Sequence, residues 1–175
     1  MGWLAKYGLW IVLGVAVVMV AGYGVYRAYR WFRLDSMRVE VPWFEVEVQL
    51  DDTAERVLRE RGETIIVSAH FDGSPKRRTG YELGNIGELY LGGKEIELDG
   101  PGVARFEGIT VSKGRVVALK DPDYRVHISV VSGRRTHKNN LLDTDSAWVP
   151  ISEVQHKRHV ITGKLLREPD GKGEE

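Results

Sequence analysis

An uninterrupted apolar stretch near the N-terminus limits what this chain can fold into more than any other feature. The twenty residues between Lys6 and Arg27 carry no charge and read YGLWIVLGVAVVMVAGYGVY. As a helix rising about 1.5 Å per residue, this stretch would be roughly 30 Å long, which matches the hydrocarbon thickness of a bilayer. Tryptophan and tyrosine residues lie at both of its ends, as they do at membrane interfaces. The sequence therefore predicts an uncleaved signal-anchor over residues 1–33, with a signal peptide cleaved near residues 20–22 as the alternative.

Charge is divided unevenly along the chain. The 175 residues include 25 basic and 25 acidic side chains, but residues 1–33 contain four basic residues and no acid. The rest therefore has 21 basic and 25 acidic side chains, a net charge of −4. This balance excludes a nucleic-acid-binding protein that depends on a basic surface. The absence of cysteine excludes disulfides, thiolate zinc sites and cysteine nucleophiles.

Two indications disagree about which side of the membrane holds the C-terminal part. One basic residue precedes the apolar stretch, whereas four follow it closely: Arg27, Arg30, Arg33 and Arg38. The positive-inside rule would therefore place the C-terminal part in the cytoplasm. A small β-domain behind an uncleaved N-terminal anchor, in contrast, is commonly exported. We expect the exported (periplasmic or extracellular) face and keep the cytoplasmic face as the alternative.

The sequence after the anchor has the hydrophobic period of two that is typical of β-strands. A linker over residues 34–38 leads into seven such segments and one short helix, which together make up residues 39–167. A polar tail over residues 168–175 ends the chain. Short strands separated by turn signals predict an all-β domain, an antiparallel β-sandwich of seven strands.

The alternation also predicts which side chains of the clearest strands face outward. His70 faces outward in the segment over residues 63–72. In the segment over residues 124–132, His127 lies on the side opposite to Tyr124 and Val126. Gly92-Gly93 separates two apolar segments and predicts a two-residue hairpin turn. The chain would reverse direction at this turn, so the segments before and after it count as two of the seven predicted strands.

One short motif indicates a type of sandwich. Leu119 and Pro122 precede Tyr124, which begins the penultimate predicted strand. This arrangement resembles the tyrosine corner of immunoglobulin-like and fibronectin type III sandwiches. The resemblance implies that the hydroxyl of Tyr124 bonds to backbone upstream of it, and it implies an architecture rather than an activity. A transthyretin-like sandwich is the alternative.

Motifs for catalysis or metal binding are sparse. The chain has no G-x-S-x-G nucleophile elbow. Asn139, Asp143 and Asp145 place oxygen-bearing side chains close together in sequence, as a calcium ion would require. They lack the central glycine and bidentate glutamate of a calcium loop, so a surface loop rich in Asx turns is the simpler interpretation. We expect no enzyme activity, no cofactor and no metal.

Two basic loops are the most distinctive polar feature of the predicted sandwich. Their basic residues are Lys76, Arg77 and Arg78 in the first loop and Arg134, Arg135 and Lys138 in the second. With seven consecutive strands, both loops would emerge at the pole where the first strand begins. Because the first strand follows the anchor closely, that pole would face the membrane. Solvated loops are the usual interpretation of such charge runs. The alternative hypothesis is that both loops contact anionic headgroups, or an acidic partner, together with the arginines that follow the apolar stretch.

These features predict a non-catalytic binding or scaffolding subunit at the membrane surface, because loops and edge strands are the usual contact surfaces of a sandwich. Its partners would be the lipid bilayer and a protein of a membrane or envelope assembly, and no nucleic acid. One alternative is a membrane-tethered inhibitor of the immunity type. Another is a membrane-tethered hydrolase or metal-dependent enzyme with its site in residues 133–150.

Overall fold

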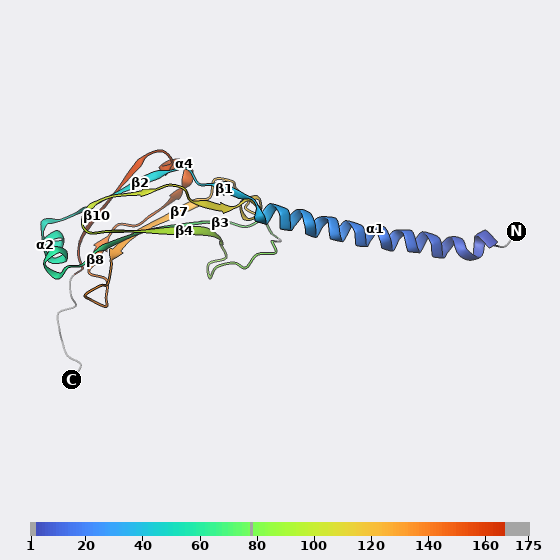
Figure 1. Ribbon diagram of the computed structural model, residues 1–175, viewed down its shortest axis with the longest axis horizontal. Helices are drawn as coiled ribbons and strands as arrows, with labels where there is room; N and C mark the ends of the chain where they lie inside the picture. The colour runs from blue at the N-terminus through green and yellow to red at the C-terminus, as the bar shows by residue number, and fades with distance from the viewer. Residues whose placement is uncertain (1–2, 78, 167–175) are drawn as a thin grey trace, which may run out of the picture.

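The computed structural model describes residues 3–77 and 79–166. Arg78 and the predicted tail over residues 168–175 therefore lie outside the described residues. Helix α1 (Trp3–Ser36) projects from one end of a β-rich domain, and helix α2 (Asp52–Arg61) lies at the opposite end (Figure 1).

Helix α1 is long and apolar enough to span a membrane. Within its segment Val12–Ser36, an 18-residue window has a mean hydropathy of 1.5, and none of this window is buried inside the domain. The predicted linker over residues 34–38 is wrong in part, because the helix continues to Ser36 and strand β1 (Arg38–Glu40) follows almost at once. No glycine or proline interrupts the helix after Gly24, so nothing in the sequence ends it at residue 33.

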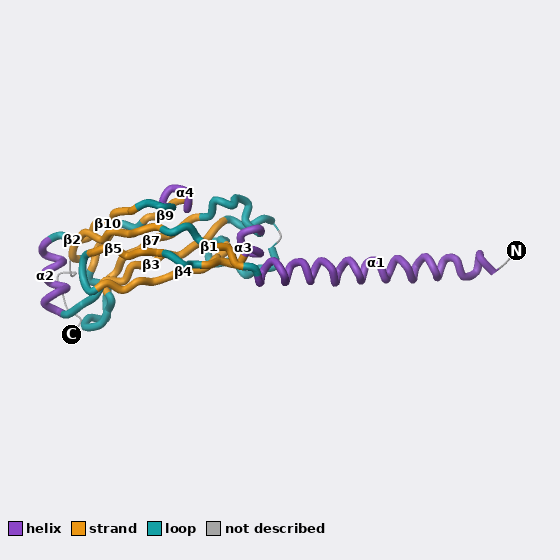
Figure 2. The backbone as a smooth tube through the Cα atoms, turned by 45° about the horizontal axis from the view of Figure 1, so that its top comes forward, coloured by secondary structure: helices purple, strands orange, loops and turns teal. Residues whose placement is uncertain are grey.

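Ten strands among the described residues form three sheets, where the sequence predicted seven strands. The remaining strands are β2 (Phe44–Leu50), β3 (Ile65–Gly73), β4 (Leu89–Leu98), β5 (Gly102–Phe106), β6 (Thr110–Ser112), β7 (Arg125–Ser132), β8 (Leu142–Thr144), β9 (Ala147–Pro150) and β10 (Arg158–Leu165). Two short helices, α3 (Lys113–Val117) and α4 (Ile151–Val154), complete the fold (Figure 2).

The core lies between two four-stranded sheets with the orders β5-β2-β10-β8 and β4-β3-β7-β9. Alternate residues of β2, β3 and β7 are buried, as the period of two predicts. Phe44 stacks on Phe106 within its own sheet, with ring centroids 5.0 Å apart, and meets Phe71 of the other sheet edge-on at 6.4 Å. Strands β2 and β10 pair in parallel, so the predicted purely antiparallel arrangement is wrong for this pair.

The predicted hairpin at Gly92-Gly93 is also wrong, because β4 runs through both glycines as one strand. The glycines pair with Phe71 and His70 of β3, beside a β-bulge at Phe71/Asp72. A side chain at position 93 would clash, since its Cβ would lie 2.6 Å from the ring of His70. Glycine is therefore required here by close packing within a sheet and not by a turn.

The strand order differs from that of an immunoglobulin fold. Strands β3 and β4 pair along their full length in one sheet, whereas the second and third strands of an immunoglobulin sandwich lie in different sheets. Tyr124 is buried, and its ring packs edge-on against Phe71 with centroids 6.1 Å apart. No hydrogen bond of its hydroxyl occurs among the described residues, so the predicted tyrosine-corner contact is not formed there.

The end of helix α1 is fixed to the domain through Asp35. Its Oδ1 accepts hydrogen bonds from the hydroxyls of Ser112 at 2.6 Å and Tyr81 at 3.0 Å. Trp31, one helical turn earlier, packs on the ring of Tyr81 with centroids 4.8 Å apart. Directly after the helix, β1 pairs with β6, so backbone hydrogen bonds continue the attachment. The helix and the sheets are therefore joined rigidly rather than through a flexible linker.

Gly114 makes this attachment sterically possible. A Cβ at this position would lie 2.6 Å from the hydroxyl of Tyr81 and 3.0 Å from the backbone of Asp35. We expect Gly114→Ala to loosen the helix from the domain at a cost of about 1–3 kcal/mol, because the backbone of Asp35 would have to move. The measurement is the distribution of distances between spin labels on cysteines introduced at Phe32 and Lys120. We expect a narrow distribution in the protein with Gly114 and a broad one in Gly114→Ala.

Gly100→Ala is the matched control, since nothing lies within 4 Å of the Cβ that it would introduce. It should keep the narrow distribution. An equally narrow distribution in Gly114→Ala would contradict the proposed steric role of Gly114.

Candidate functional site

The two predicted basic loops lie at opposite ends of the domain. Lys76 and Arg77 follow β3 and lie near helix α1, where Lys76 and Arg27 line the same hollow. The loop with Arg134 and Arg135 follows β7, whose last residue, Ser132, pairs with the first residue of β3. The prediction that both loops face the membrane is therefore wrong. Because β4 is one strand and not a hairpin, β7 runs antiparallel to β3, opposite to its predicted direction.

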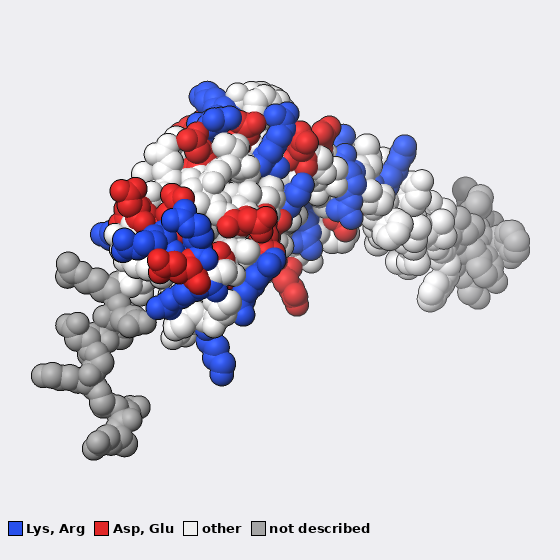
Figure 3. Space-filling model, turned by 60° about the vertical axis from the view of Figure 1, so that its left-hand side comes forward, with Lys and Arg blue, Asp and Glu red and all other residues white. Residues whose placement is uncertain are grey.

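A buried carboxylate holds the distal loop in place. Glu63 Oε1 accepts hydrogen bonds from the backbone N–H groups of Arg135 (2.8 Å) and Thr64 (3.2 Å). Its Oε2 accepts from the backbone N–H and the hydroxyl of Thr136, at 3.0 and 2.9 Å. Arg135 also pairs with Glu97, at 2.8 Å. Figure 3 shows acidic and basic side chains interleaved over the end that includes this loop, rather than a basic patch.

The residues of the predicted calcium loop are not gathered around one point. Asp143 and Asp145 line a shallow hollow, but Lys164 lies 3.5 Å from Asp143 and the hydroxyl of Thr162 donates to Asp145 at 2.9 Å. Asn139 does not line that hollow. Within residues 3–77 and 79–166, no group of three or more histidine, aspartate or glutamate side chains is placed to hold a metal ion.

The outer faces of the two large sheets differ in character. On the β5-β2-β10 face, Arg158 pairs with Glu45 at 2.9 Å and with Glu47 at 3.2 Å, and Arg105 pairs with Glu45 at 3.2 Å. These exposed pairs satisfy one another, as on an ordinary solvated sheet surface. The β4-β3-β7-β9 face has a different composition, with aromatic rings and imidazoles at its centre.

Strand register brings two histidines side by side on this second face. His70 of β3 is the direct cross-strand partner of His127 of β7, and His127 in turn faces Trp148 of β9. Tyr90 of β4 lies edge-on to His70, with ring centroids 6.2 Å apart, in the space that Gly93 leaves open. We call this surface the histidine face; it consists of His70, Asp72, Glu88, Tyr90, Arg125, His127 and Trp148.

Two carboxylates lie at the edge of the histidine face that is nearest to helix α1. Asp72 is paired with Tyr90 and Arg125 by register, and Glu88 accepts a hydrogen bond from the hydroxyl of Ser74 at 3.1 Å. Asp72 Oδ1 and Glu88 Oε2 are the two buried side-chain oxygen atoms in the described part of the chain that have no hydrogen-bond partner. Burial raises the pKa of Asp72, and the neighbouring charge of Glu88 raises this pKa further.

The remaining side chains of the histidine face are suited to binding a partner. Tyr90 is 50% exposed and Trp148 is 48% exposed, and the guanidinium of Arg125 lies 4.9 Å from the centre of the Trp148 ring. Tyrosine, tryptophan and arginine are the residue types that dominate the binding energy of protein interfaces. The alternation in each strand predicted the side on which His70 and His127 lie, but it did not predict this site, because register alone makes them neighbours.

Replacing Glu63 tests how strongly the buried carboxylate holds the distal loop. Burial alone would raise the pKa of Glu63, but the hydrogen bonds outweigh burial and lower this pKa from 4.5 to about 2. We expect Glu63→Gln to lower the free energy of unfolding by about 2 kcal/mol at pH 7, since an amide cannot accept all of these bonds. Chemical denaturation of the full chain in detergent measures this, with the exposed Glu60→Gln as the matched control.

The stabilising effect of Glu63 should depend on pH in one direction. A carboxyl with a lowered pKa in the folded state stabilises the fold fully above its unfolded-state pKa of 4.5, and this contribution is lost as the pH falls toward 2. The difference between wild type and Glu63→Gln should therefore shrink between pH 4.5 and pH 2. A difference that stays constant over this range would contradict the assignment.

Asp72 should show the opposite behaviour. Because its pKa is raised in the folded state, the charged form opposes folding at neutral pH, and this cost disappears below the ordinary pKa of 3.8. Asp72→Asn removes the charge and offers Glu88 a donor, so we expect a gain in stability of about 1 kcal/mol at pH 7 that vanishes under acidic conditions. Thermal unfolding measures the gain, and Asp99→Asn on the surface should show none.

Comparison with known proteins does not reveal a relative from which a function could be transferred: no protein family, no curated protein and no solved structure matches this chain.

Proposed function

We propose that this protein is a single-pass membrane protein whose β-sandwich is a non-catalytic binding or scaffolding subunit at the membrane surface. The proposed anchor is helix α1, which is supported by its length and by a mean hydropathy of 1.5 over an unburied 18-residue window. The proposed contact surface is the histidine face. Of the predicted sandwich types, the transthyretin-like one stays a prediction, and so does the exported position of the domain. Single cysteines in this cysteine-free chain, labelled from outside intact cells, test the position.

The contrast between the two outer faces supports this proposal most directly. The charged groups of the β5-β2-β10 face pair with one another, whereas the histidine face has two exposed aromatic rings and two buried carboxylate oxygens without hydrogen-bond partners. A buried acceptor without a partner costs roughly 1–3 kcal/mol. A partner that donates hydrogen bonds to these oxygens would remove this unfavourable free energy on binding. This favours a histidine face that is covered by a partner protein.

The described residues offer less support for the enzymatic alternative. Within residues 133–150, His137 Nδ1 interacts with the backbone of its neighbour Asn139 at 3.3 Å and with no acidic side chain. Asp143 and Asp145 are engaged by Lys164 and Thr162, as described above. The inhibitor alternative uses the same kind of contact surface as the proposed subunit, so it differs only in what the partner does.

Paired alanine variants on the two outer faces test the proposal. We expect the full chain, purified from its own cells in mild detergent, to retain a partner protein in stoichiometric amount. Tyr90→Ala with Trp148→Ala should weaken this association by roughly 30-fold, because aromatic hot spots contribute about 2 kcal/mol or more. The matched control is Val103→Ala with Val160→Ala on the other face, where both side chains are also exposed.

Circular dichroism and thermal unfolding of each variant establish that the fold is retained. Equal loss of the partner in both double variants would contradict a role for the histidine face, and a wild-type chain that purifies alone would contradict the subunit proposal. A stoichiometric metal in place of a partner would instead favour the enzymatic alternative.

A further inference from the structure

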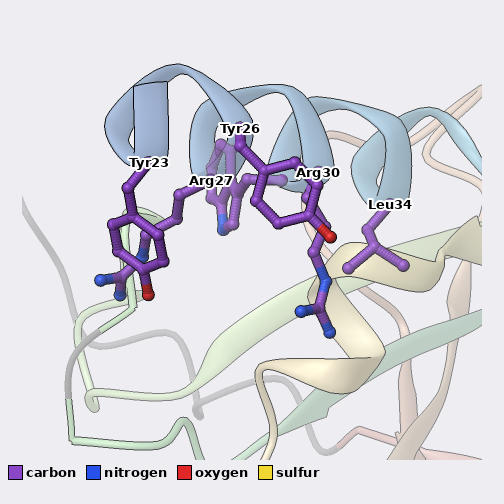
Figure 4. Close-up of a pocket in the computed structure, with 6 residues that line it drawn as sticks. Tyr23, Tyr26, Arg27, Arg30 and Leu34 are labelled. Atoms are coloured by element: carbon purple, nitrogen blue, oxygen red, sulfur yellow. The ribbon is translucent and has the colours of Figure 1, made fainter. Parts of the chain in front are cut away.

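A stripe of aromatic and basic side chains, with one leucine, lies on the face of helix α1 that points toward the domain. The spacing of these residues at i, i+3, i+4, i+7, i+8 and i+11 places them on one side of the helix. They are Tyr23, Tyr26, Arg27, Arg30, Trp31 and Leu34, and they line a hollow of about 280 Å³. Figure 4 shows the side chains of Arg27 and Arg30 pointing from the helix toward the domain.

The domain supplies a second wall. An adjoining hollow of about 230 Å³ lies between the helix and the loop after β3, and it shares Arg27, Trp31 and Leu34 with the first hollow. Lys76 and Tyr81 line it from the loop. The two hollows thus adjoin along helix α1, and we call them together the junction hollow.

The lining of the junction hollow is cationic. Arg27, Arg30 and Lys76 contribute three positive charges, and no aspartate or glutamate is among the lining residues of either part. None of the ion pairs found within the described ranges includes these three side chains. The ammonium of Lys76 donates to the backbone carbonyl of Val117 at 2.8 Å, which holds this charge at the hollow. The site is thus complementary to an anion.

The position of the hollow along helix α1 indicates which anion would reach it. If the uncharged stretch that ends at Tyr26 fills the hydrocarbon core, Arg27 and Arg30 lie in the headgroup layer, which extends roughly 5–8 Å beyond the core. Tyr23 and Tyr26, which are 65% and 60% exposed, lie at the end nearest the core. Such rings suit contact with the first part of an acyl chain. A phospholipid would reach the hollow with its phosphate toward the cations and its chains toward the tyrosines.

We propose that the junction hollow binds one anionic phospholipid through its headgroup phosphate, held by Arg27, Arg30 and Lys76. This inference rests on the proposed membrane anchor and adds a discrete lipid site to it. The bound lipid would bridge the helix and the loop after β3, and so would fix the height of the domain above the membrane.

Native mass spectrometry of the delipidated full chain in detergent tests the site. We expect phosphatidylglycerol to bind with a stoichiometry of one, and more tightly than phosphatidylcholine. Arg27→Gln with Arg30→Gln should weaken phosphatidylglycerol roughly 30-fold, as two basic residues at a lipid surface would. Lys76→Gln should weaken it about fivefold.

Two neighbouring charges provide matched controls. Arg33 lies on the same helix but does not line the hollow, and Lys120 is exposed near the same loop. Arg33→Gln and Lys120→Gln should leave phosphatidylglycerol binding unchanged.

Three outcomes would overturn the proposal. Equal binding of phosphatidylglycerol and phosphatidylcholine by the wild type would remove the preference for an anion. If the control variants weakened phosphatidylglycerol binding as much as the lining variants do, the effect would come from overall charge and not from a discrete site. Displacement of the lipid by inorganic phosphate would identify a free anion as the ligand. The membrane anchor is tested separately by carbonate extraction. If α1 does not span the membrane, carbonate would extract the wild-type chain from membranes.

Discussion

The hydrogen bonds to Asp35 determine how every other part of the molecule is placed relative to helix α1. The carboxylate ends the helix against Ser112 and Tyr81, which belong to β6 and to the loop after β3. Gly114 allows the approach, and the β1–β6 pairing continues it into the sheets. A chain with a flexible linker at this point could tumble freely above a membrane. In this chain the contacts of Asp35 and the β1–β6 pairing place the junction hollow and the histidine face relative to the proposed anchor.

Direction along the sheets was the part of the fold that the sequence predicted least well, and one pair of glycines explains why. Gly92-Gly93 has the composition of a hairpin turn, yet the pair lies within β4, where Gly93 makes room for His70 and Tyr90. Local composition does not distinguish these two uses of glycine, because the deciding contact comes from β3, more than twenty residues earlier in the chain. The mistaken reversal inverted the predicted direction of β7 and so placed the Arg134 loop at the wrong end.

Features that depend on local periodicity were predicted correctly, whereas those that depend on pairing were not. The outward positions of His70 and His127 follow from alternation within each strand, but their contact requires the β3–β7 register. Glu63 could have been noticed only as a charged residue at the start of a predicted strand. Its role depends on the backbone N–H groups of residues 135 and 136, which no local pattern connects to it. Asp35 is similar, because its two partners lie 46 and 77 residues away.

The fixed junction also limits where a partner of the histidine face can lie. The strands of the two large sheets extend away from the junction roughly along the direction of helix α1, so the outer sheet faces are turned sideways relative to that axis (Figures 1 and 2). The histidine face belongs to the half of its sheet nearest the helix, because His70 and Asp72 lie close to the end of β3 at which the loop to Tyr81 begins. If α1 crosses a bilayer, a partner bound there would stand beside the domain and close to the headgroups. That geometry favours a second membrane-anchored protein over a soluble one, since the two would share both the depth and the orientation that the membrane imposes.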